Sequence, residues 1–226
     1  MASYKLTYFD INGRAEYIRL AFVAGGIEFD NELINRDMWQ AMKPTTPFGQ
    51  LPLLTYTKAE GEEPVKIAQS NAILRFVGKA IGLYPEDPVA AMHVDSAMDY
   101  MEDIMAPMQA TIFPPRYAMP AWDGEDARMA ARARLANDIL PSKFAAAEAL
   151  MAANGSGWVV GDAMTIADLK WYTHLNRFTS GDLDGVPATI LDDYPNLKGL
   201  LAKVEAVPAI AEWQAAEQAR KAAKNT

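Results

Sequence analysis

Tyr8 is the residue whose position first suggests chemistry. In the stretch YKLTYFDINGRAEYIRL, residues 4–20, it lies near the end of an alternating apolar segment, just before a pattern typical of an amphipathic helix. A phenol at the end of a strand can donate a hydrogen bond to an anion at the mouth of a sheet. A strand-end tyrosine is, however, usually a half-buried core residue whose hydroxyl contacts water. The other residues must decide between these two interpretations.

The common catalytic signatures are absent from the sequence. There is no P-loop, no GxGxxG, no HExxH and no GxSxG pattern. The two histidines, His93 and His174, have no triad partner near them in sequence, which favours structural roles. The absence of cysteine excludes disulfides, thiolate metal sites and an internal thiol nucleophile. Any sulfur chemistry would therefore need an imported thiol.

Composition and charge limit the classes of partner. The chain has 226 residues, half of them hydrophobic, which is enough for a sizeable core and for two small domains. A formal net charge of -8 argues against nucleic acid as a partner, because phosphates require a basic face. No apolar run can span a bilayer, and the amino end lacks the pattern of a secretory signal. We expect a cytoplasmic protein with no membrane partner.

The basic residues cluster only in the carboxyl tail, EQARKAAKNT. This tail contains Arg220, Lys221 and Lys224. Cations in the last turn of a helix complement its dipole. We favour that interpretation over a ligand-binding role for the tail.

A methionine-rich helical pattern, which we call the methionine seam, follows a Gly/Pro linker at residues 82–88. Its apolar members recur at alternating steps of three and four, the spacing of a helical packing seam. They are Ala91, Val94, Met98, Met101, Met105 and Met108. An acidic stripe lies beside them: Asp95, Asp99, Glu102 and Asp103. The last three could offer carboxylates to a hard cation. Without an EF-hand loop, a solvated face or an interface for a cationic group is favoured over a metal site.

The first eighty residues have the pattern of a compact α/β layer. Alternation over residues 4–9 predicts a strand, and a helix is expected from about Arg14 to Gly25-Gly26. IEFDNELI predicts a second strand, RDMWQAM a short helix, and the loop KPTTPFGQLPLLTY leads into a third strand. VKIA predicts a fourth strand, and SNAILRFVGKAIG a helix capped by Ser70.

Beyond the linker the strand signals stop and helical patterns take over. Besides the methionine seam, helices are expected at about 125–151, 165–178 and 192–222, the last interrupted near Pro208. Thr165 followed three residues later by Asp168 predicts a capping box ahead of a buried helix. The sequence thus predicts an α/β domain over residues 1–82 and an all-helical domain over residues 83–226.

Several motifs, in order along the chain, resemble the glutathione transferases. They are YFDINGRAE, DMWQAMK, FGQLPLL and QSNAILRFV, and the resemblance continues through the methionine seam, GDAMTIADL and VPAIAEW. The sigma class, which includes prostaglandin-isomerising members, is the class that the chain resembles most. The resemblance implies a thioredoxin-like amino-terminal domain that binds glutathione and an all-helical domain with an electrophile pocket. It also implies a homodimer and a role in detoxification.

The resemblance assigns the two carboxylates of glutathione to two predicted helices. Gln69 and Ser70 would bind the γ-glutamyl carboxylate at a helix start, where free N–H groups and the positive dipole end attract an anion. Trp39 and Lys43, at i and i+4 of the short helix, would meet the glycyl carboxylate. The alternatives are that Ser70 is only an N-cap and that Trp39 and Lys43 are an ordinary surface pair.

Three further contacts follow from the resemblance. Leu51-Pro52 is similar to the family's cis-proline step, which leaves the Leu51 backbone free to pair with the cysteinyl backbone of glutathione. The ammonium of glutathione would meet Asp103 of the partner subunit, although this residue also fits a solvated stripe. Gln50 stands where some relatives have Lys, which is expected to weaken glutathione binding at the glycyl end.

In this setting Tyr8 and Arg14 receive catalytic roles. A free thiol has a pKa near 8.5, and lowering it by two units requires roughly 2.7 kcal/mol of preference for the anion. A hydrogen bond to a charged group contributes about 1.5–3 kcal/mol. The Tyr8 hydroxyl, helped by the positive field of Arg14, therefore nearly suffices to keep the sulfur anionic. Tyr8 acts as a donor here and need not become a base.

The electrophile pocket follows only by analogy with the family. Its expected lining is Phe9, Arg14, Met105 and Met108, although the packing seam competes for the two methionines. Ala110 stands where prostaglandin-isomerising members have Trp, which lowers the expectation of that activity. We expect conjugation of glutathione to small hydrophobic electrophiles, or peroxide reduction, with no metal required. The alternatives are a ligand carrier or crystallin-like structural protein, and a dedicated glutathione-dependent prostaglandin isomerase.

Overall fold

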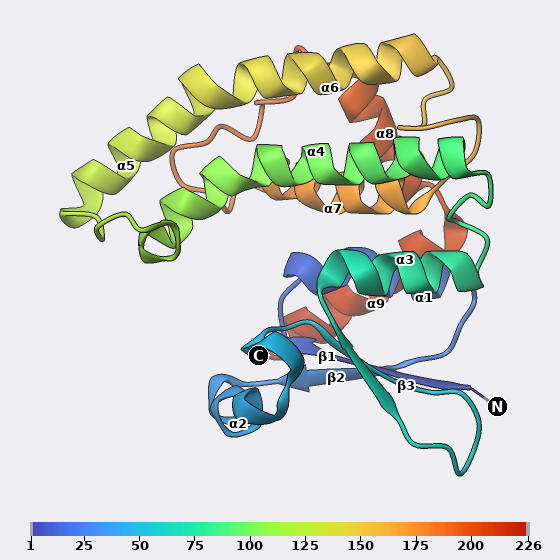
Figure 1. Cartoon of the computed structure of the whole chain (residues 1–226). Helices are drawn as coiled ribbons and strands as arrows, with labels where there is room; N and C mark the ends of the chain where they lie inside the picture. Colours follow the sequence, from blue (N-terminus) through green and yellow to red (C-terminus); the bar gives the residue numbers. More distant parts are fainter. Residues whose placement is uncertain (1, 225–226) are drawn as a thin grey trace. The chain divides into compact units, whose positions relative to one another are not determined.

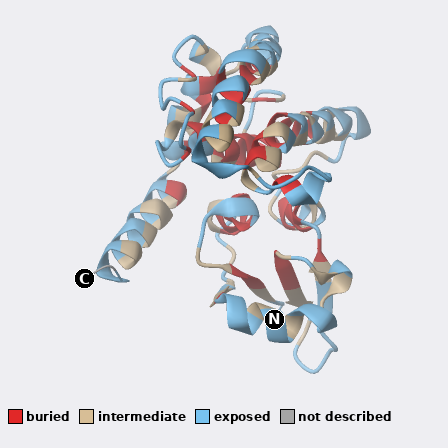
Figure 2. Cartoon of the chain, turned by 90° about the vertical axis from the view of Figure 1, so that its left-hand side faces the viewer, coloured by how far each residue is buried: buried red, intermediate tan, exposed pale blue. Residues whose placement is uncertain are grey.

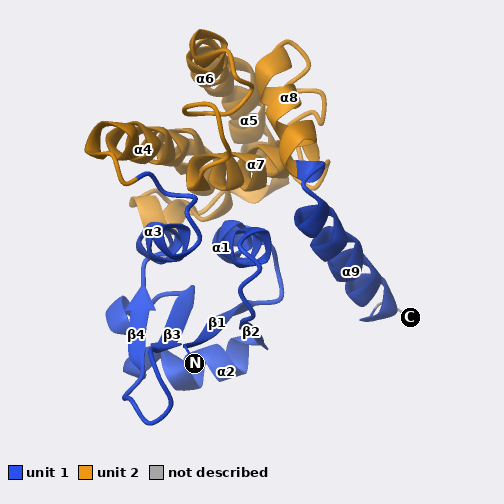
Figure 3. Cartoon of the chain, turned by 90° about the vertical axis from the view of Figure 1, so that its right-hand side faces the viewer, with its two compact units in different colours: residues 1–85, 205–226 blue, residues 86–204 orange. Residues whose placement is uncertain are grey.

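Two compact units make up the chain in a computed structural model, which describes residues 2–224. The first unit contains residues 1–85 and 205–226, and the second contains residues 86–204 (Figure 3). The sequence predicted domains of 1–82 and 83–226, and that division stays a prediction. Residues 205–224 pack with the first unit even though they follow the helical segment in sequence.

The first unit is built on a mixed sheet with the strand order β2-β1-β3-β4 (Figure 1). The strands are β1 (Ser3–Phe9), β2 (Asp30–Ile34), β3 (Leu53–Thr57) and β4 (Val65–Ala68). β1 runs parallel to β2 and antiparallel to β3, and β3 pairs antiparallel with β4. β1 is thus a central strand of the sheet, and its presence confirms the strand predicted from the alternating pattern.

The helices of the first unit are α1, α2, α3 and α9. Their bounds are α1 (Gly13–Ala24), α2 (Arg36–Met42), α3 (Ser70–Ala80) and α9 (Pro208–Lys224). α1 and α3 lie side by side on one face of the sheet (Figure 1). The core between sheet and helices consists of fully buried apolar residues, shown in red in Figure 2: Leu6, Tyr17, Ile18, Phe22, Leu54, Ile73, Leu74 and Val77. This layer confirms the predicted α/β, thioredoxin-like arrangement.

The second strand begins later than the sequence predicted, at Asp30 instead of Ile27. The Ile27 N–H donates to the Phe22 carbonyl at 2.9 Å, so the residues after α1 first close the end of that helix. The Phe29 ring then stacks on Phe22, with centroids 4.7 Å apart. Ile27 therefore belongs to the turn after α1, the half-buried Phe29 packs on Phe22, and the ladder starts after them.

The second unit is all-helical, as predicted. It contains α4 (Pro88–Ile112), α5 (Gly124–Arg134), a π-helical turn (Leu135–Ile139), α6 (Leu140–Asn154), α7 (Ile166–Thr179) and α8 (Pro195–Glu205). The predicted helix over about 125–151 is thus α5, the π turn and α6. The predicted helix over 192–222 is the pair α8 and α9, which meet near Pro208.

α7 is the buried helix of the second unit. The predicted capping box is confirmed: Thr165 and Asp168 exchange side-chain and backbone hydrogen bonds at its start. The Trp171 indole donates to the Ala97 carbonyl of α4 at 2.8 Å. Lys170, fully buried, donates to the Met98 carbonyl and to Glu102, both at 2.7 Å. These bonds join α7 to the methionine seam of α4.

Candidate active site

Tyr8 lies at the end of β1, directly opposite Leu33 of β2 in the parallel register. Its side chain is 9% exposed, and its hydroxyl oxygen accepts the backbone N–H of Arg14 at 3.3 Å. The Arg19 guanidinium lies 5.9 Å from the centroid of the Tyr8 ring. A phenol can accept one hydrogen bond and still donate its own proton. The strand end and the first turn of α1 therefore hold a phenolic donor in a fixed place.

Gly13 makes this approach of hydroxyl and helix possible, and it is absent from the predicted site. Its φ of +47° is in the left-handed region that favours glycine. A Cβ atom at this position would lie 2.8 Å from the Tyr8 hydroxyl and 3.0 Å from Cε1 of the same ring. Any other residue would therefore have to displace the phenol. The signal in the sequence is a glycine at the junction of strand and helix.

Replacing Gly13 by Ala is expected to lower kcat/KM for a glutathione-dependent reaction by about tenfold or more, because small displacements of catalytic groups are costly. The matched control is Gly26→Ala, since Gly26 also has a positive φ, +63°, but has no atom within 4 Å of an added Cβ. Steady-state kinetics of the two variants separate the clash from backbone strain. Equal losses in both variants would contradict the argument.

Two of the predicted glutathione-binding residues, Gln69 and Ser70, lie at the start of α3. Gln69 adopts φ 75° and ψ 106°, a conformation that non-glycine residues rarely adopt and that clusters at functional sites. The first helical bond runs from Ile73 N–H to the Gln69 carbonyl at 3.0 Å. The N-cap residue is therefore Gln69, and the predicted cap at Ser70 is wrong, because Ser70, 6% exposed, is already the first helical residue. The N–H groups ahead of Ile73 thus lie before the helical ladder begins, as an anion site requires.

The loop before β3 meets the same helix start. The Leu51-Pro52 peptide bond is cis, which confirms that prediction. The amide of Gln69 donates to the side-chain oxygen of Gln50 at 2.9 Å. This bond was not predicted from the sequence. It brings together two segments that are 19 residues apart in the chain.

The short helix α2 places Trp39 near the end of β1. Asn35 caps the helix by accepting the Met38 N–H at 2.9 Å. The half-buried Trp39 ring meets the Phe9 ring edge to face, with centroids 6.4 Å apart. Lys43, exposed, follows the last turn and donates its N–H to the Trp39 carbonyl, so the two side chains share a face as predicted.

The other predicted site residues lie on α4 in the second unit. Asp103 is exposed, whereas Met105 and Met108 are 3% and 1% exposed. That burial agrees with the packing seam, and the pocket role of the two methionines stays a prediction. Glu102 is an ion-pair partner of Lys170, so the acidic stripe is not a set of equivalent carboxylates. In residues 2–224 no group of three or more His, Cys, Asp or Glu could hold a metal ion.

The chain belongs to the glutathione S-transferase family. Its residues 4–79 match the profile "Glutathione S-transferase, N-terminal domain", and residues 115–217 match "Glutathione S-transferase, C-terminal domain". The mixed sheet with its helical second unit is the fold of this family. The protein is thus a transferase, and its family uses glutathione as a substrate.

Relatives of known name cover nearly the whole chain. Glutathione S-transferase 1 of Ascaris suum is 34% identical over 220 residues, which are 94% of this chain and 96% of the relative. The hematopoietic prostaglandin D synthase of Gallus gallus is 35% identical over 217 residues, with the same coverage. A structure described as a monomeric glutathione S-transferase of Necator americanus is similar with a TM-score of 0.76 and 32% identity, covering 95% of this chain and 97% of that one.

Within the part of the chain that the structure describes, no helix is long and apolar enough to cross a membrane.

Proposed function

We propose that the protein is a sigma-class glutathione transferase that uses Tyr8 to hold glutathione as a thiolate. The observation that supports this most strongly is the position of the Tyr8 hydroxyl, at a strand end and bonded to the Arg14 N–H at 3.3 Å. Accepting that N–H polarises the phenol and makes it a better donor. A bound thiol whose sulfur faces this donor would ionise at a lower pH than it does in water.

The glutathione backbone is proposed to lie along the edge formed by α2, the cis-proline loop and α3. Gln69 and Ser70 would bind the γ-glutamyl carboxylate, and Trp39 and Lys43 the glycyl carboxylate. The Leu51-Pro52 segment would pair with the cysteinyl backbone as an added strand. The Gln50–Gln69 bond supports this assignment, because it joins the two segments that would face the two ends of the peptide. The proposed sites for the carboxylates and for the sulfur are separate.

The second substrate is proposed to be a small hydrophobic electrophile, with organic peroxides as a further class. The residues proposed to contact this substrate, by the resemblance to the family, are Phe9, Arg14, Met105 and Met108. With a chloroaromatic, the thiolate would form a carbon–sulfur bond and chloride would leave with the electron pair of the broken bond. With an enal or an isothiocyanate, the thiolate would add to carbon and the product would take up a proton. With an organic peroxide, the thiolate would attack oxygen and release the alcohol, and a second glutathione would convert the sulfenic acid to glutathione disulfide and water. Cytoplasmic residence and a role in detoxification belong to the same proposal.

A glutathione-dependent screen across chloroaromatics, peroxides, enals and isothiocyanates tests this function. We expect conjugation of at least one electrophile class and ultraviolet absorbance of bound thiolate. Thiolate absorbance without turnover of any substrate would instead support a non-enzymatic carrier or crystallin-like role.

A narrower candidate is a prostaglandin isomerase, because several relatives are named hematopoietic prostaglandin D synthase. Ala110 weighs against it, because the resemblance to the family implies a tryptophan at this position in prostaglandin-isomerising members. A product assay with one prostaglandin endoperoxide decides between the two functions. Formation of a single isomer at a rate above that of chloroaromatic conjugation would favour the isomerase.

Asp103→Asn tests the proposed contact across a homodimer. The Michaelis constant for glutathione is expected to rise about fivefold with little change in kcat, because an exposed charge-assisted hydrogen bond contributes about 1 kcal/mol. Asp99→Asn, one turn earlier on α4, is the matched control. The Necator americanus relative is described as monomeric, so sedimentation must accompany the kinetics. A stable monomer with unchanged kinetics in Asp103→Asn would contradict the cross-subunit contact.

A further inference from the structure

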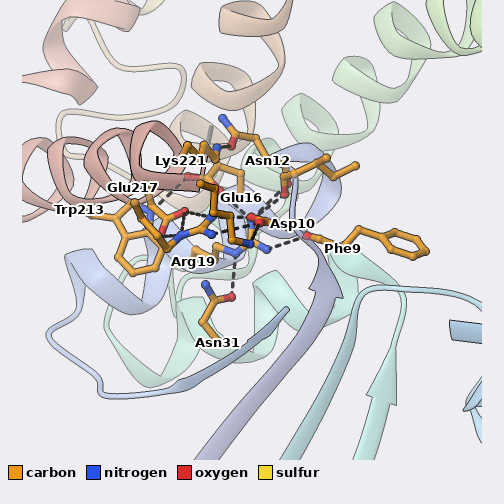
Figure 4. Close-up of polar contacts among 12 residues, drawn as sticks. Phe9, Asp10, Asn12, Glu16, Arg19, Asn31, Trp213, Glu217 and Lys221 are labelled. Carbon is orange, nitrogen blue, oxygen red and sulfur yellow. Dashed lines mark hydrogen bonds and ion pairs between the residues drawn. The ribbon is translucent and has the colours of Figure 1, made fainter. Parts of the chain in front are cut away.

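The turn between β1 and α1, residues Asp10–Asn12, is held from the side of α1 by a buried arginine. Arg19 is 3% exposed and donates to the Ile11 carbonyl at 2.9 Å and to the Phe9 carbonyl at 3.5 Å. Its charge is balanced by Glu16, at 2.9 Å (Figure 4). One arginine therefore fixes the backbone on both sides of Asp10.

The same turn is held a second time by the carboxyl-terminal helix. Arg220 of α9 donates to both carboxylate oxygens of Asp10, with Nη1 to Oδ2 at 3.1 Å. Lys224 donates to Oδ2 of the same carboxylate at 2.6 Å, and Lys221 donates to the side chain of Asn12 at 2.7 Å. We call these contacts of Asp10 and Asn12 with Arg220, Lys221 and Lys224 the α9 clamp. It ties two segments of the first unit that lie about 210 residues apart.

α9 also contacts the buried ion pair of Arg19 and Glu16, which adjoins the turn. The Trp213 indole donates to Glu16 at 3.2 Å (Figure 4). The centroid of the Trp213 ring lies 5.8 Å from that of the Phe29 ring. Glu217 accepts the Arg220 Nε–H at 2.9 Å and so orients the guanidinium toward Asp10. The match to the family's C-terminal profile ends at residue 217. The cations of the α9 clamp therefore lie beyond the matched region.

The ion pairs of the α9 clamp persist across the neutral pH range. Arg220, and next Lys224, hold the pKa of Asp10 well below its usual range, and Arg220 also lowers the pKa of Glu217. The side chains of Asp10 and Arg220 are each 29% exposed, so added salt screens the pair only in part. Acid would weaken the clamp only far below neutral pH.

We propose that Asp10 and Arg220 are positioning residues for the reaction assigned to Tyr8, because the α9 clamp fixes the turn that joins Tyr8 to Arg14. This inference rests on the proposed function. The Arg14 N–H to Tyr8 oxygen distance, 3.3 Å, is at the long end of the hydrogen-bond range, so a small movement of the turn breaks it. A displacement of about 1 Å at a catalytic group can lower turnover by roughly a hundredfold.

Replacing Arg220 and replacing Asp10 change the net charge near Tyr8 in opposite directions. Arg220→Gln removes the bidentate anchor and leaves the Asp10 carboxylate, two residues from Tyr8, with less compensation. Asp10→Asn removes the same anchor but leaves the cations in place. Both variants loosen the turn, whereas only Arg220→Gln adds net negative charge near the proposed thiolate. We therefore expect the pH midpoint of thiolate formation to be higher in Arg220→Gln than in Asp10→Asn.

The experiment uses the full chain with glutathione and an activated chloroaromatic. We expect Asp10→Asn and Arg220→Gln each to lower kcat about tenfold, with a smaller change in the Michaelis constant for glutathione. The double variant is expected to be no slower than the slower single variant, because both remove one interaction. Arg220→Lys, which keeps the charge but loses the fork, should recover part of the rate. Lys198→Gln, which breaks an ion pair with Asp192, is the control.

Amide hydrogen exchange at residues 10–14, measured without glutathione, gives a readout that does not depend on activity. It is expected to be faster in both single variants than in the control, with the rest of the sheet unchanged. Unchanged exchange, or a kcat equal to that of Lys198→Gln, overturns the positioning role. If the native chain forms no thiolate and conjugates no electrophile, the proposed function fails. The positioning role then fails as well, even if hydrogen exchange shows that the α9 clamp holds the turn.

Discussion

Tyr8→Phe is expected to lower kcat for glutathione conjugation by about a hundredfold, the typical effect of removing one preorganised donor to a developing or stored anion. The Michaelis constant for glutathione should change by less than about twofold. The two carboxylate sites remain, and they bind glutathione equally well in the ground state and in the transition state. The phenyl ring keeps the contacts of the tyrosine ring with Phe9 and Arg19, so the strand end keeps its packing. The variant therefore removes only the hydroxyl.

The matched control is Tyr100→Phe. Tyr100 donates its hydroxyl to the Lys143 carbonyl at 3.0 Å in the second unit, so this variant also removes one bonded phenol. Steady-state kinetics should be measured across the pH range, since a thiolate formed at high pH compensates for a missing donor. The loss of kcat in Tyr8→Phe should therefore become smaller as the pH rises above about 8.5. A deficit below threefold at neutral pH would remove Tyr8 from the mechanism.

Asp168→Ala is expected to lower the free energy of unfolding by roughly 3–5 kcal/mol, from two orphaned donors at about 1–3 kcal/mol each plus the lost cap. The carboxylate is fully buried and accepts the N–H groups of Val159 and Thr165, both at 2.7 Å, and the Thr165 hydroxyl at 2.9 Å. Alanine leaves the two backbone N–H donors, of Val159 and Thr165, buried without their acceptor. The loss affects the start of α7, the buried helix of the second unit.

Urea unfolding of Asp168→Ala should be compared with that of Asp162→Ala. Asp162 is an exposed carboxylate in the same connection, so its removal is expected to change stability by less than about 0.5 kcal/mol. Similar unfolding midpoints for the two variants would show that the capping box contributes little to stability.

The layered fold follows from local patterns in the sequence. Alternation over residues 4–9 gives β1, and the capping box at Thr165 and Asp168 gives the start of α7, because both signals act within a few residues. The π turn at Leu135–Ile139 was not predicted. The surrounding sequence favours an uninterrupted helix, and no proline or glycine marks the change within that turn.

The place of the carboxyl-terminal helix could not be predicted from such patterns. The cations of the tail were interpreted as partners of the helix dipole, and Lys221 and Lys224 do lie in the last turn of α9. Their additional partners, Asp10 and Asn12, are more than 200 residues away in sequence. Pairings at that separation depend on the tertiary fold and leave no periodic signal.

The candidate site was predicted from motifs more than from geometry. The cis bond before Pro52 and the shared face of Trp39 and Lys43 agree with the prediction. Gly13 is marked in the sequence only as a glycine at the junction of strand and helix, and its close approach to the phenol depends on the folded chain. The positive φ of Gln69 has no distinct sequence signal. The roles of the α4 residues stay predictions.

A crystal structure of the protein with glutathione tests the central claim most directly, because that claim concerns one hydrogen bond. We expect the glutathione sulfur within about 3.5 Å of the Tyr8 hydroxyl oxygen, close to donor range for a charged acceptor. A sulfur more than about 4 Å from that oxygen, bonded instead to a different donor, would contradict the account.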